Sequence, residues 1–238
     1  MDKQIFNIIF FSLFAFVISI FLVNRITLCN ETTKYKTLDE VLLEVEKADG
    51  EFKTMKAGIV ITRTIPLLES TEISKGKIHY KKPDRLLLKF DPPRDEVNII
   101  DGKHIWVYHP KAKQVEKYTI NKGKQTSQSL NFFGFGYGES VASARKDYTI
   151  SLTDTTEIGK KCFYVLDLLP RNTSTQYTKI RLWIDEGLWL PVKIELHESG
   201  GEVVNIIEFD HIKLNSRMSD KLFVFDVPRG VEVVEPFQ

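Results

Sequence analysis

The sequence predicts a mainly β domain of the α+β class, and three observations lead to this class. Apolar residues recur with a period of two in many short runs, as at Ile78/Tyr80 and Leu86/Leu88/Phe90. This spacing is typical of strands with one buried face. Turn-forming stretches such as KKPDR, DPPRDE and IDGK separate the runs at the short intervals of an antiparallel meander. One amphipathic helical stretch precedes them.

Length and charge narrow the class of function. The 238 residues leave room for one sizeable domain of this type. The 33 Lys and Arg residues nearly balance the 32 Asp and Glu residues, so charge gives no reason to expect a nucleic-acid partner or an anionic membrane surface. Sixteen Phe and eight Tyr residues are well suited to lining an apolar surface.

The N-terminal segment predicts export. Residues 5–23 are 19 residues without a charge, long for the apolar part of a signal peptide and long enough to span a bilayer. No small-x-small cleavage site follows. Residues 1–29 are therefore expected to be a signal peptide or an N-terminal membrane anchor. Lipidation at Cys29 is a third alternative, although Leu28 before it is not the small residue that a lipobox requires.

The first element of the folded domain, expected over residues 36–238, is a helix. Thr37 and Glu40 form a capping box at its start, and Gly50 is expected to end it. Its apolar stripe should pack on a sheet and consists of Leu38, Val41, Leu42 and Val45.

Strands dominate the rest of the chain in two meanders and a short last strand. The Asp101-Gly102 step is a strong hairpin signal. The first meander is expected at Ala57–Thr64, Gly76–Lys81, Arg85–Phe90, Val97–Ile100, His104–His109 and Gln114–Ile120. The second is expected from Tyr148 through Leu152 and at Cys162–Leu169, Lys179–Ile184, Pro191–Leu196 and Val203–Leu214, with the last strand at Phe223–Val227.

Residues 127–146, between the meanders, break the strand pattern. Aromatic residues alternate there with three glycines, and a helix-forming stretch follows. Such a segment is mobile yet tends to bury its aromatic side chains. We expect a lid made of a short helix, a glycine-rich bend and a second helix. Its apolar residues are Leu130, Phe132, Phe133, Phe135 and Tyr137.

No motif of catalysis or metal binding is convincing, so we expect neither an enzyme nor a cofactor. The glycines of residues 134–138 have no βαβ unit around them. Ser140 lies in GESVA, which lacks the second glycine and the leading strand of a nucleophile elbow. The five histidines show no metal-ligand spacing, and Cys162 is best explained as a small buried apolar residue.

The apolar strand faces allow two interpretations. Leu86/Leu88/Phe90, Ile180/Leu182/Ile184 and Val192/Ile194/Leu196 alternate with charged residues, which is typical of one wet and one apolar face on an antiparallel sheet. Part of that surface must cover the predicted helix. One four-residue stripe cannot cover some ten strands, however, so the pattern favours a ligand cavity between the sheet and the lid.

The same motifs resemble the LolA-type outer-membrane lipoprotein carriers and the related lipoprotein-sorting proteins. The resemblance spans about residues 36–236, and the D-G-K-x-x-W-x-Y-x-P run at 101–110 is its most specific part. It is carried by Gly76–Phe90, Asp91–Pro93, Ile99–Lys103, Ile105–Pro110 and Gln114–Tyr118, with KIRLWIDEGLWLPVKIEL and FVFDVPRGVEVVEP further on.

The resemblance implies a strongly curved antiparallel sheet that forms an incomplete barrel. An N-terminal helix and the helical, Gly/Phe-rich lid would close it, and its interior would hold the acyl chains of a lipoprotein. The sheet side of this interior would be lined by Leu86, Leu88, Phe90, Ile180, Leu182 and Ile184, and the lid side by Phe132, Phe133 and Phe135. Which face of the Trp106 strand looks inward stays open.

One position departs from the family pattern. An Arg that precedes a Pro in the first block of the better-known carriers bonds the lid backbone, whereas this chain has Lys82-Pro83. Lysine lacks the planar fork of arginine, so a lid latch at Lys82 would be weaker. Arg85 is an alternative cation three residues on.

The resemblance also implies partners and a compartment. The chain would be a monomeric periplasmic carrier that receives acylated lipoproteins from an inner-membrane ABC-type release complex and passes them to an outer-membrane acceptor. An uncleaved N-terminus would retain it at the inner membrane. In that case the alternative is a membrane-anchored lipid-sensing or regulatory domain on the same scaffold. A hydrolase that uses Ser140 is the remaining rival.

Overall fold

The computed structural model describes residues 35–65, 69–120, 135–172, 177–198 and 203–236. The chain divides into two compact units, Met1–Tyr35 and Lys36–Gln238. The described helices and strands belong to the second unit. Within the described residues no helix is both long and apolar enough to cross a membrane. The predicted signal peptide or anchor, with its Cys29 alternative, lies outside them.

The first helix confirms the sequence prediction at its start. Helix α2 (Leu38–Glu51) begins at the N-cap Thr37, and the capping box with Glu40 is formed. The helix continues through Gly50 to Glu51 and is capped by Phe52, so the predicted end at Gly50 is slightly too early. Val41, Leu42 and Val45 are buried in one cluster with the sheet residues, which places α2 on that face of the sheet.

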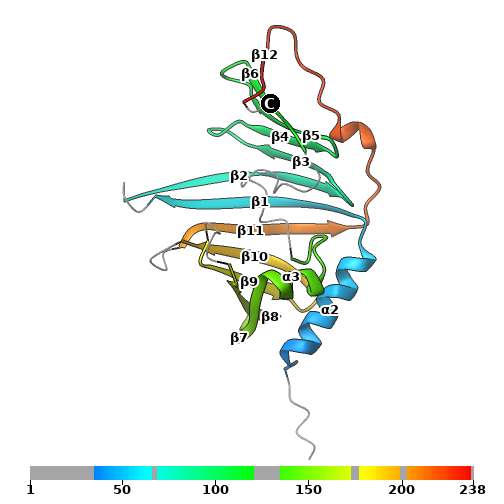
Figure 1. Ribbon diagram of the computed structural model, residues 1–238, viewed down its shortest axis with the longest axis vertical. Coiled ribbons are helices and arrows are strands. Elements are labelled where there is room, and N and C mark those ends of the chain that lie inside the picture. Colours follow the sequence, from blue (N-terminus) through cyan, green and yellow to red (C-terminus); the bar gives the residue numbers. More distant parts are fainter. Residues whose placement is uncertain (1–34, 66–68, 121–134, 173–176, 199–202, 237–238) are drawn as a thin grey trace, which may run out of the picture. The chain divides into compact units, whose positions relative to one another are not determined.

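The sheet has twelve strands in the order β12-β6-β5-β4-β3-β2-β1-β11-β10-β9-β8-β7, and it is curved and open (Figure 1). All neighbours are antiparallel except β12 and β6. The strands are β1 (Thr54–Ile65), β2 (Ser70–Lys81), β3 (Arg85–Phe90), β4 (Val97–Asp101), β5 (His104–His109), β6 (Gln114–Thr119), β7 (Tyr148–Ile158), β8 (Lys161–Pro170), β9 (Lys179–Asp185), β10 (Leu190–His197), β11 (Val203–Leu214) and β12 (Glu232–Val234).

The eleven strands of the two predicted meanders are confirmed, several of them with longer ends. The last predicted strand is wrong. Phe223 is the last residue of a short 3-10 helix, η3 (Asp220–Phe223), and residues 224–227 belong to no strand of the sheet. The strand lies further on, where β12 pairs in parallel with β6 through Val233 and Val115.

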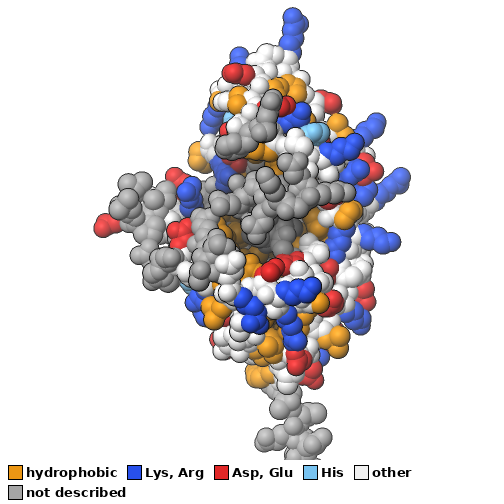
Figure 2. All heavy atoms as spheres, in the orientation of Figure 1, with side chains coloured by type: hydrophobic (Ala, Val, Ile, Leu, Met, Phe, Trp, Pro, Cys, Tyr) orange, Lys and Arg blue, Asp and Glu red, His pale blue; other side chains and the backbone are white. Residues whose placement is uncertain are grey.

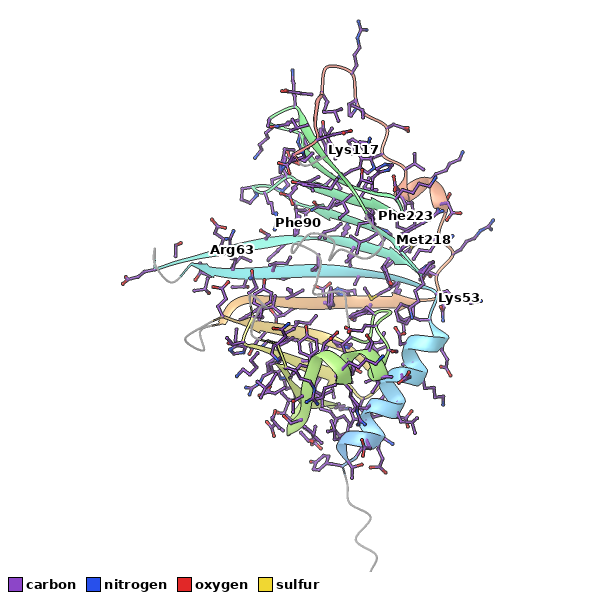
Figure 3. The ribbon with its side chains drawn as sticks, viewed as in Figure 1. Lys53, Arg63, Phe90, Lys117, Met218 and Phe223 are labelled. Atoms are coloured by element: carbon purple, nitrogen blue, oxygen red, sulfur yellow. The ribbon has the colours of Figure 1, made fainter. Side chains whose placement is uncertain are left out.

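The C-terminal segment explains this difference, because its aromatic residues pack against the sheet. Trp106 and Tyr108 of β5 contact the ring of Phe225, with ring centroids 5.4 and 5.5 Å apart. Phe223 is 1% exposed and Met218 is 9% exposed (Figure 3). Apolar residues that alternate as in a strand therefore pack on the sheet instead of joining it.

The two faces of the sheet differ. We call the face that carries the main core cluster the inner face, and the opposite one the outer face. Leu152, Leu166, Leu182, Ile194, Ile207 and Ile61 lie opposite one another on six neighbouring strands and form one apolar row across the inner face. Ile105 lies opposite Ile100, which packs against the same cluster, so Trp106 belongs to the outer face.

Two glycines give matched tests of the packing. A Cβ at Gly76 of β2 would lie 2.4 Å from the backbone oxygen of Lys89 on β3, whereas a Cβ at Gly50 of α2 would meet nothing within 4 Å. We expect Gly76→Ala to lower the free energy of unfolding by about 1–3 kcal/mol through overpacking. Gly50→Ala should raise it by roughly 0.5–1 kcal/mol through helix propensity. Urea unfolding measures both, and equal effects would contradict the observed strand spacing.

A bidentate ion pair on the outer face predicts a pH dependence. Arg181 Nε and Nη2 donate to the two carboxylate oxygens of Asp167 at 2.7 and 2.8 Å. These bonds lower the pKa of Asp167 below its ordinary value of 3.8, even though burial opposes them. A carboxyl group whose pKa is lowered on folding stabilises the fold above its unfolded pKa and loses that effect as the pH falls through its folded pKa.

We therefore expect the contribution of Asp167 to be complete at pH 6 and to disappear progressively below about pH 4. Asp167→Asn should lower the free energy of unfolding at pH 6 but should have little further effect at pH 2.5. Urea unfolding at both pH values checks this. An equal loss at the two values would show that the ionised carboxylate contributes nothing.

Candidate functional site

The inner face brings the predicted sheet residues together. Leu86, Leu88 and Phe90 of β3 are at most 2% exposed, and Leu182 and Ile184 of β9 are at most 3% exposed. Ile180 is half-buried and packs against the same cluster. The strands β2, β1, β11 and β10 lie between β3 and β9, and their inner-face residues continue the apolar surface from one group to the other.

The face is viewed from the side of α2 and α3 in Figure 2. Hydrophobic side chains are visible near the centre of this view, beside residues that the structure does not describe, and Lys, Arg, Asp and Glu side chains lie toward its margins. The arrangement is that of an apolar surface with a charged border. Such a surface is suited to binding apolar groups.

Residues 135–147, which comprise the described part of the predicted lid (135–146) and Asp147, pack on this face. Phe135 and Tyr137 are 6% and 2% exposed, and the segment ends in helix α3 (Val141–Asp147). The Tyr137 ring has edge contacts with Phe52 and Phe209, at centroid distances of 6.2 and 5.8 Å. Its hydroxyl donates to the carbonyl oxygen of Pro191. Phe132, Phe133 and the first predicted lid helix lie outside the described residues.

Two side chains hold the backbone of this segment at residues 137 and 138. The Tyr80 hydroxyl of β2 donates to the carbonyl oxygen of Tyr137 at 3.0 Å. The Asp49 carboxylate of α2 accepts the N–H of Gly138 at 2.8 Å. Gly138 has a φ of +114°, a conformation that L side chains rarely adopt, so the glycine is required for this approach.

Lys82 acts on this anchor through Asp49. Its ammonium donates to the carbonyl oxygen of Asp49 and, at 2.7 Å, to the Asp49 carboxylate. It also lies 4.0 Å from the centroid of the Phe52 ring. The lysine thus binds the end of α2, and the carboxylate that it stabilises binds residue 138. The contacts of Lys82 described here do not include a direct bond to residues 135–147.

The sequence did not single out Tyr80, Asp49 or Tyr137 as partners of one another. One signal was present for Asp49, since a carboxylate in the last turn of a helix faces the negative end of the helix dipole and needs a compensating cation. The last turn of α2 contains no basic residue. Lys82, distant in sequence, supplies the charge.

The two tyrosine hydroxyls stay protonated at physiological pH. Burial, together with the nearby carboxylates of Asp49 and Asp84, raises the pKa of Tyr80 to about 12. Burial also raises the pKa of Tyr137. Both groups therefore remain hydrogen-bond donors, and the anchoring of residues 137 and 138 does not change through their titration between pH 5 and 9.

Ser140, considered for a hydrolase, and Arg85, considered as an alternative latch cation, both have structural partners. Ser140 is the N-cap of α3, and its Oγ accepts the N–H of Ser143 at 3.1 Å. Arg85 forms an ion pair with Asp220 of η3 at 3.0 Å. Among the described residues there is no group of three or more His, Cys, Asp or Glu side chains that could hold a metal ion.

The domain is an open, curved antiparallel sheet with an apolar inner face. Comparison with known proteins shows which family it belongs to. A family model described as "uncharacterized protein" matches residues 87–224, more than half of the chain, and the chain belongs to this family. The sequence resemblance to LolA-type lipoprotein carriers is confirmed by similarity to curated outer-membrane lipoprotein carrier proteins.

Two curated relatives are similar along most of the chain. An uncharacterized protein of Methanocaldococcus jannaschii is 28% identical over 219 residues, which are 92% of this chain and 59% of that protein. The chain thus spans less than two thirds of that relative. An outer-membrane lipoprotein carrier protein of Legionella pneumophila is 26% identical over 162 residues, 68% of this chain and 74% of that protein.

A solved structure supports the fold. An uncharacterized conserved protein from Thermus thermophilus superposes with a TM-score of 0.54 at 14% sequence identity. The match covers 83% of this chain and 98% of that one. At this identity the likeness supports the fold alone.

Proposed function

We propose that the chain is a non-enzymatic carrier that holds the acyl chains of lipoproteins against the inner face of its sheet. The observation that carries this proposal is the continuous apolar row across six strands, together with the buried Leu86, Leu88 and Phe90 of β3 on the same face beyond β2. Burial of each acyl CH₂ group contributes about 0.8 kcal/mol. A face of this extent can therefore stabilise several hydrocarbon chains.

The proposal requires residues 135–147 to move as a lid. In the described state Phe135 and Tyr137 cover the inner face, so cargo would take their place. Hydrogen bonds from Tyr80, to Asp49 and to Pro191 hold residues 137 and 138 of this lid, and Arg171 donates to the carbonyl oxygens of Arg145 and Asp147 at its C-terminal end. A competing apolar ligand would displace the contacts around residues 137 and 138, while the C-terminal end stays attached.

Lys82 and Asp49 would then form the latch of the empty carrier. In this arrangement the Gly138 N–H of the lid donates to the Asp49 carboxylate. The Lys82 ammonium affects the lid indirectly, because it pairs with that carboxylate. The side chains of Lys82 and Asp49 are 20% and 18% exposed, so solvent weakens this pair less than it weakens a fully exposed one.

The relatives support a proposal for location and hand-over. The Legionella relative is named as an outer-membrane lipoprotein carrier. For this chain we propose a periplasmic monomer that takes acylated lipoproteins from an inner-membrane ABC-type release complex and gives them to an outer-membrane acceptor. Retention of residues 1–29 would tether it at the inner membrane and would favour the lipid-sensing alternative.

Native mass spectrometry of the full chain, kept soluble in amphipol, tests the proposal. We expect a one-to-one complex after incubation with a triacylated lipopeptide. The same peptide without acyl chains is the matched control and should not bind. If both peptides bind equally, or neither binds, the chain is not a carrier of acyl chains.

A further inference from the structure

The outer face of β1, β2 and β3 carries basic side chains and, within these described strands, no acidic ones. Lys77 lies opposite both Gly58 and Lys89 and alternates with Ile78 of the core cluster, so it belongs to the outer face. Residues two apart on a strand share a face. We call the charged residues of this face the outer basic patch; they are Lys56, Lys75, Lys77, Lys81, Arg85 and Lys89.

Like charges face each other across the ladders of this patch. Two such pairs join β2 to β3, and a third joins β1 to β11: Lys77 with Lys89, Lys81 with Arg85, and Lys56 with Lys213. Directly opposite like charges destabilise a sheet. The repetition of an arrangement that opposes folding indicates that these cations serve another purpose.

One of the three pairs has an acidic partner among the described residues. Asp220 of η3 forms ion pairs with Lys81 and Arg85 at 2.5 and 3.0 Å. The Lys56 ammonium donates to the carbonyl oxygen of Arg217 at 3.4 Å, which leaves its positive charge in place. The repulsion in the other two pairs is therefore not relieved by an ion pair with the described part of the chain.

The remaining cations of the patch are available to a partner. Lys75, Lys77 and Lys89 are exposed, and their ammonium groups form neither a hydrogen bond nor an ion pair with the described residues. Asp84 and Asp91, at the two ends of β3, lie close in sequence but form no ion pair with the patch in this described structure. The balanced total charge of the chain hides this excess, because it does not report how the charges divide between the two faces.

His79 responds to the positive field of the patch. It lies opposite Lys56 on the same face. Burial lowers the pKa of His79 below its ordinary value of 6.5, and the charges of Lys56 and Lys77 lower it further. The imidazole is therefore mostly neutral at pH 7, and the charge of the face comes from its lysines and arginine.

Exposed apolar side chains flank the patch at both ends. Ile73 is exposed and lies two residues before Lys75 on the same face of β2. At the other end, Leu222 and Val224 are exposed in and directly after η3, whose Asp220 is bound to the patch. Cations beside exposed apolar side chains are typical of surfaces that lie in the interface of a membrane.

We propose that the outer basic patch binds an anionic membrane surface, with the flanking apolar side chains at the level of the lipid head groups. Five of its six cations are lysines, which act as hydrated point charges and suit a layer of many phosphates better than one bidentate partner. Helices α2 and α3 pack on the inner face, so this orientation turns the lid away from the bilayer. The proposal is additional to the inner-face function and does not depend on it.

Lysine acetylation of the full chain mixed with lipid nanodiscs tests the proposal. One set of discs contains phosphatidylcholine, and the other contains phosphatidylglycerol as well. The two sets differ only in charge, so the comparison holds whether or not residues 1–29 anchor the chain. Lys75, Lys77 and Lys89 should react about threefold or more slowly with the anionic discs at low salt. At about 0.5 M salt the difference should disappear.

Lys77→Glu separates membrane binding from folding. The new anion lies opposite Lys89, so the variant should unfold at a higher urea concentration than the unsubstituted chain. The protection of Lys75 and Lys89 by anionic discs should nevertheless fall about twofold or more. Lys47 of α2 is exposed on a helix of the inner face and provides the control. It should react equally with both discs, and Lys47→Glu should leave the protection of the patch unchanged.

Several results would overturn the proposal. They are equal reaction of the patch lysines with both discs, protection of Lys47 as strong as that of Lys77, and full protection of Lys75 and Lys89 in Lys77→Glu. Protection by soluble polyglutamate but not by anionic discs would also overturn it, and would indicate an acidic protein as the partner. Failure of lipopeptide binding in the earlier mass-spectrometry test would not affect it, because the two readouts report on different faces.

Discussion

Replacement of Tyr137 by alanine is expected to release residues 135–147 from the inner face while the sheet stays folded. The substitution removes a side chain that is 2% exposed, its ring contacts with Phe52 and Phe209, and the bond to Pro191. Loss of a large buried aromatic side chain costs about 3–5 kcal/mol. The open population of this segment should therefore rise by roughly 100-fold or more.

Native-state hydrogen exchange measures this effect. The amides of Gly138 and Ala144 should exchange much faster in Tyr137→Ala, whereas the amides of β2 and β3 should keep their protection. Tyr137→Phe is the matched control: it keeps the ring but leaves the buried Pro191 carbonyl without its donor, so about 1–3 kcal/mol should be lost. Equal acceleration in β2 and β3 would show that Tyr137 is an ordinary core residue of the whole domain.

Replacement of Asp49 by alanine is expected to have the second largest effect on the lid. It leaves the Gly138 N–H without its acceptor and removes the carboxylate partner of Lys82. A hydrogen bond to a charged group contributes about 1.5–3 kcal/mol, so the amide of residue 138 should exchange about ten- to 100-fold faster. In Asp49→Asn the exchange rate of this amide should lie between those of the unsubstituted chain and Asp49→Ala, since the amide oxygen still accepts the bond but the negative charge is lost.

Asp39 on the same helix provides the control. It pairs with Arg145 of α3, but its side chain is 84% exposed, and such exposed pairs contribute little. Asp39→Ala should leave the exchange of Gly138 nearly unchanged. If Asp39→Ala and Asp49→Ala accelerate it equally, the connection between α2 and residues 135–147 does not depend on the Asp49 carboxylate.

Much of the fold could be predicted because local signals agree with the final structure. The period-two runs of β3 and β5 have polar turns at both ends, and the capping box of α2 is complete within four residues. The prediction failed at Phe223–Val227. Apolar residues alternate there as in a strand, but the segment packs on the face of the sheet instead of pairing with a neighbouring strand. Phe225 packs on Trp106 of β5, a contact between distant residues that local pattern cannot reveal.

The site was harder to predict than the fold. The apolar residues of β3 and β9 could be found because each strand has one apolar face. The anchor of the lid could not, since it joins Asp49, Tyr80, Lys82 and Gly138 from four elements or loops. Lys82 was singled out by the family resemblance, but its bond to the end of α2 depends on how that helix lies on the sheet.

Photo-cross-linking of a triacylated lipopeptide that carries a diazirine in its acyl chain tests the central claim most directly. After irradiation of the complex with the full chain, digestion and mass spectrometry locate the modified residues. The account predicts adducts on the inner-face residues of β3 and β9, such as Leu88, Phe90 and Leu182, and more of them in Tyr137→Ala. Adducts confined to the outer face, or none above the level of a non-acylated diazirine peptide, would contradict it.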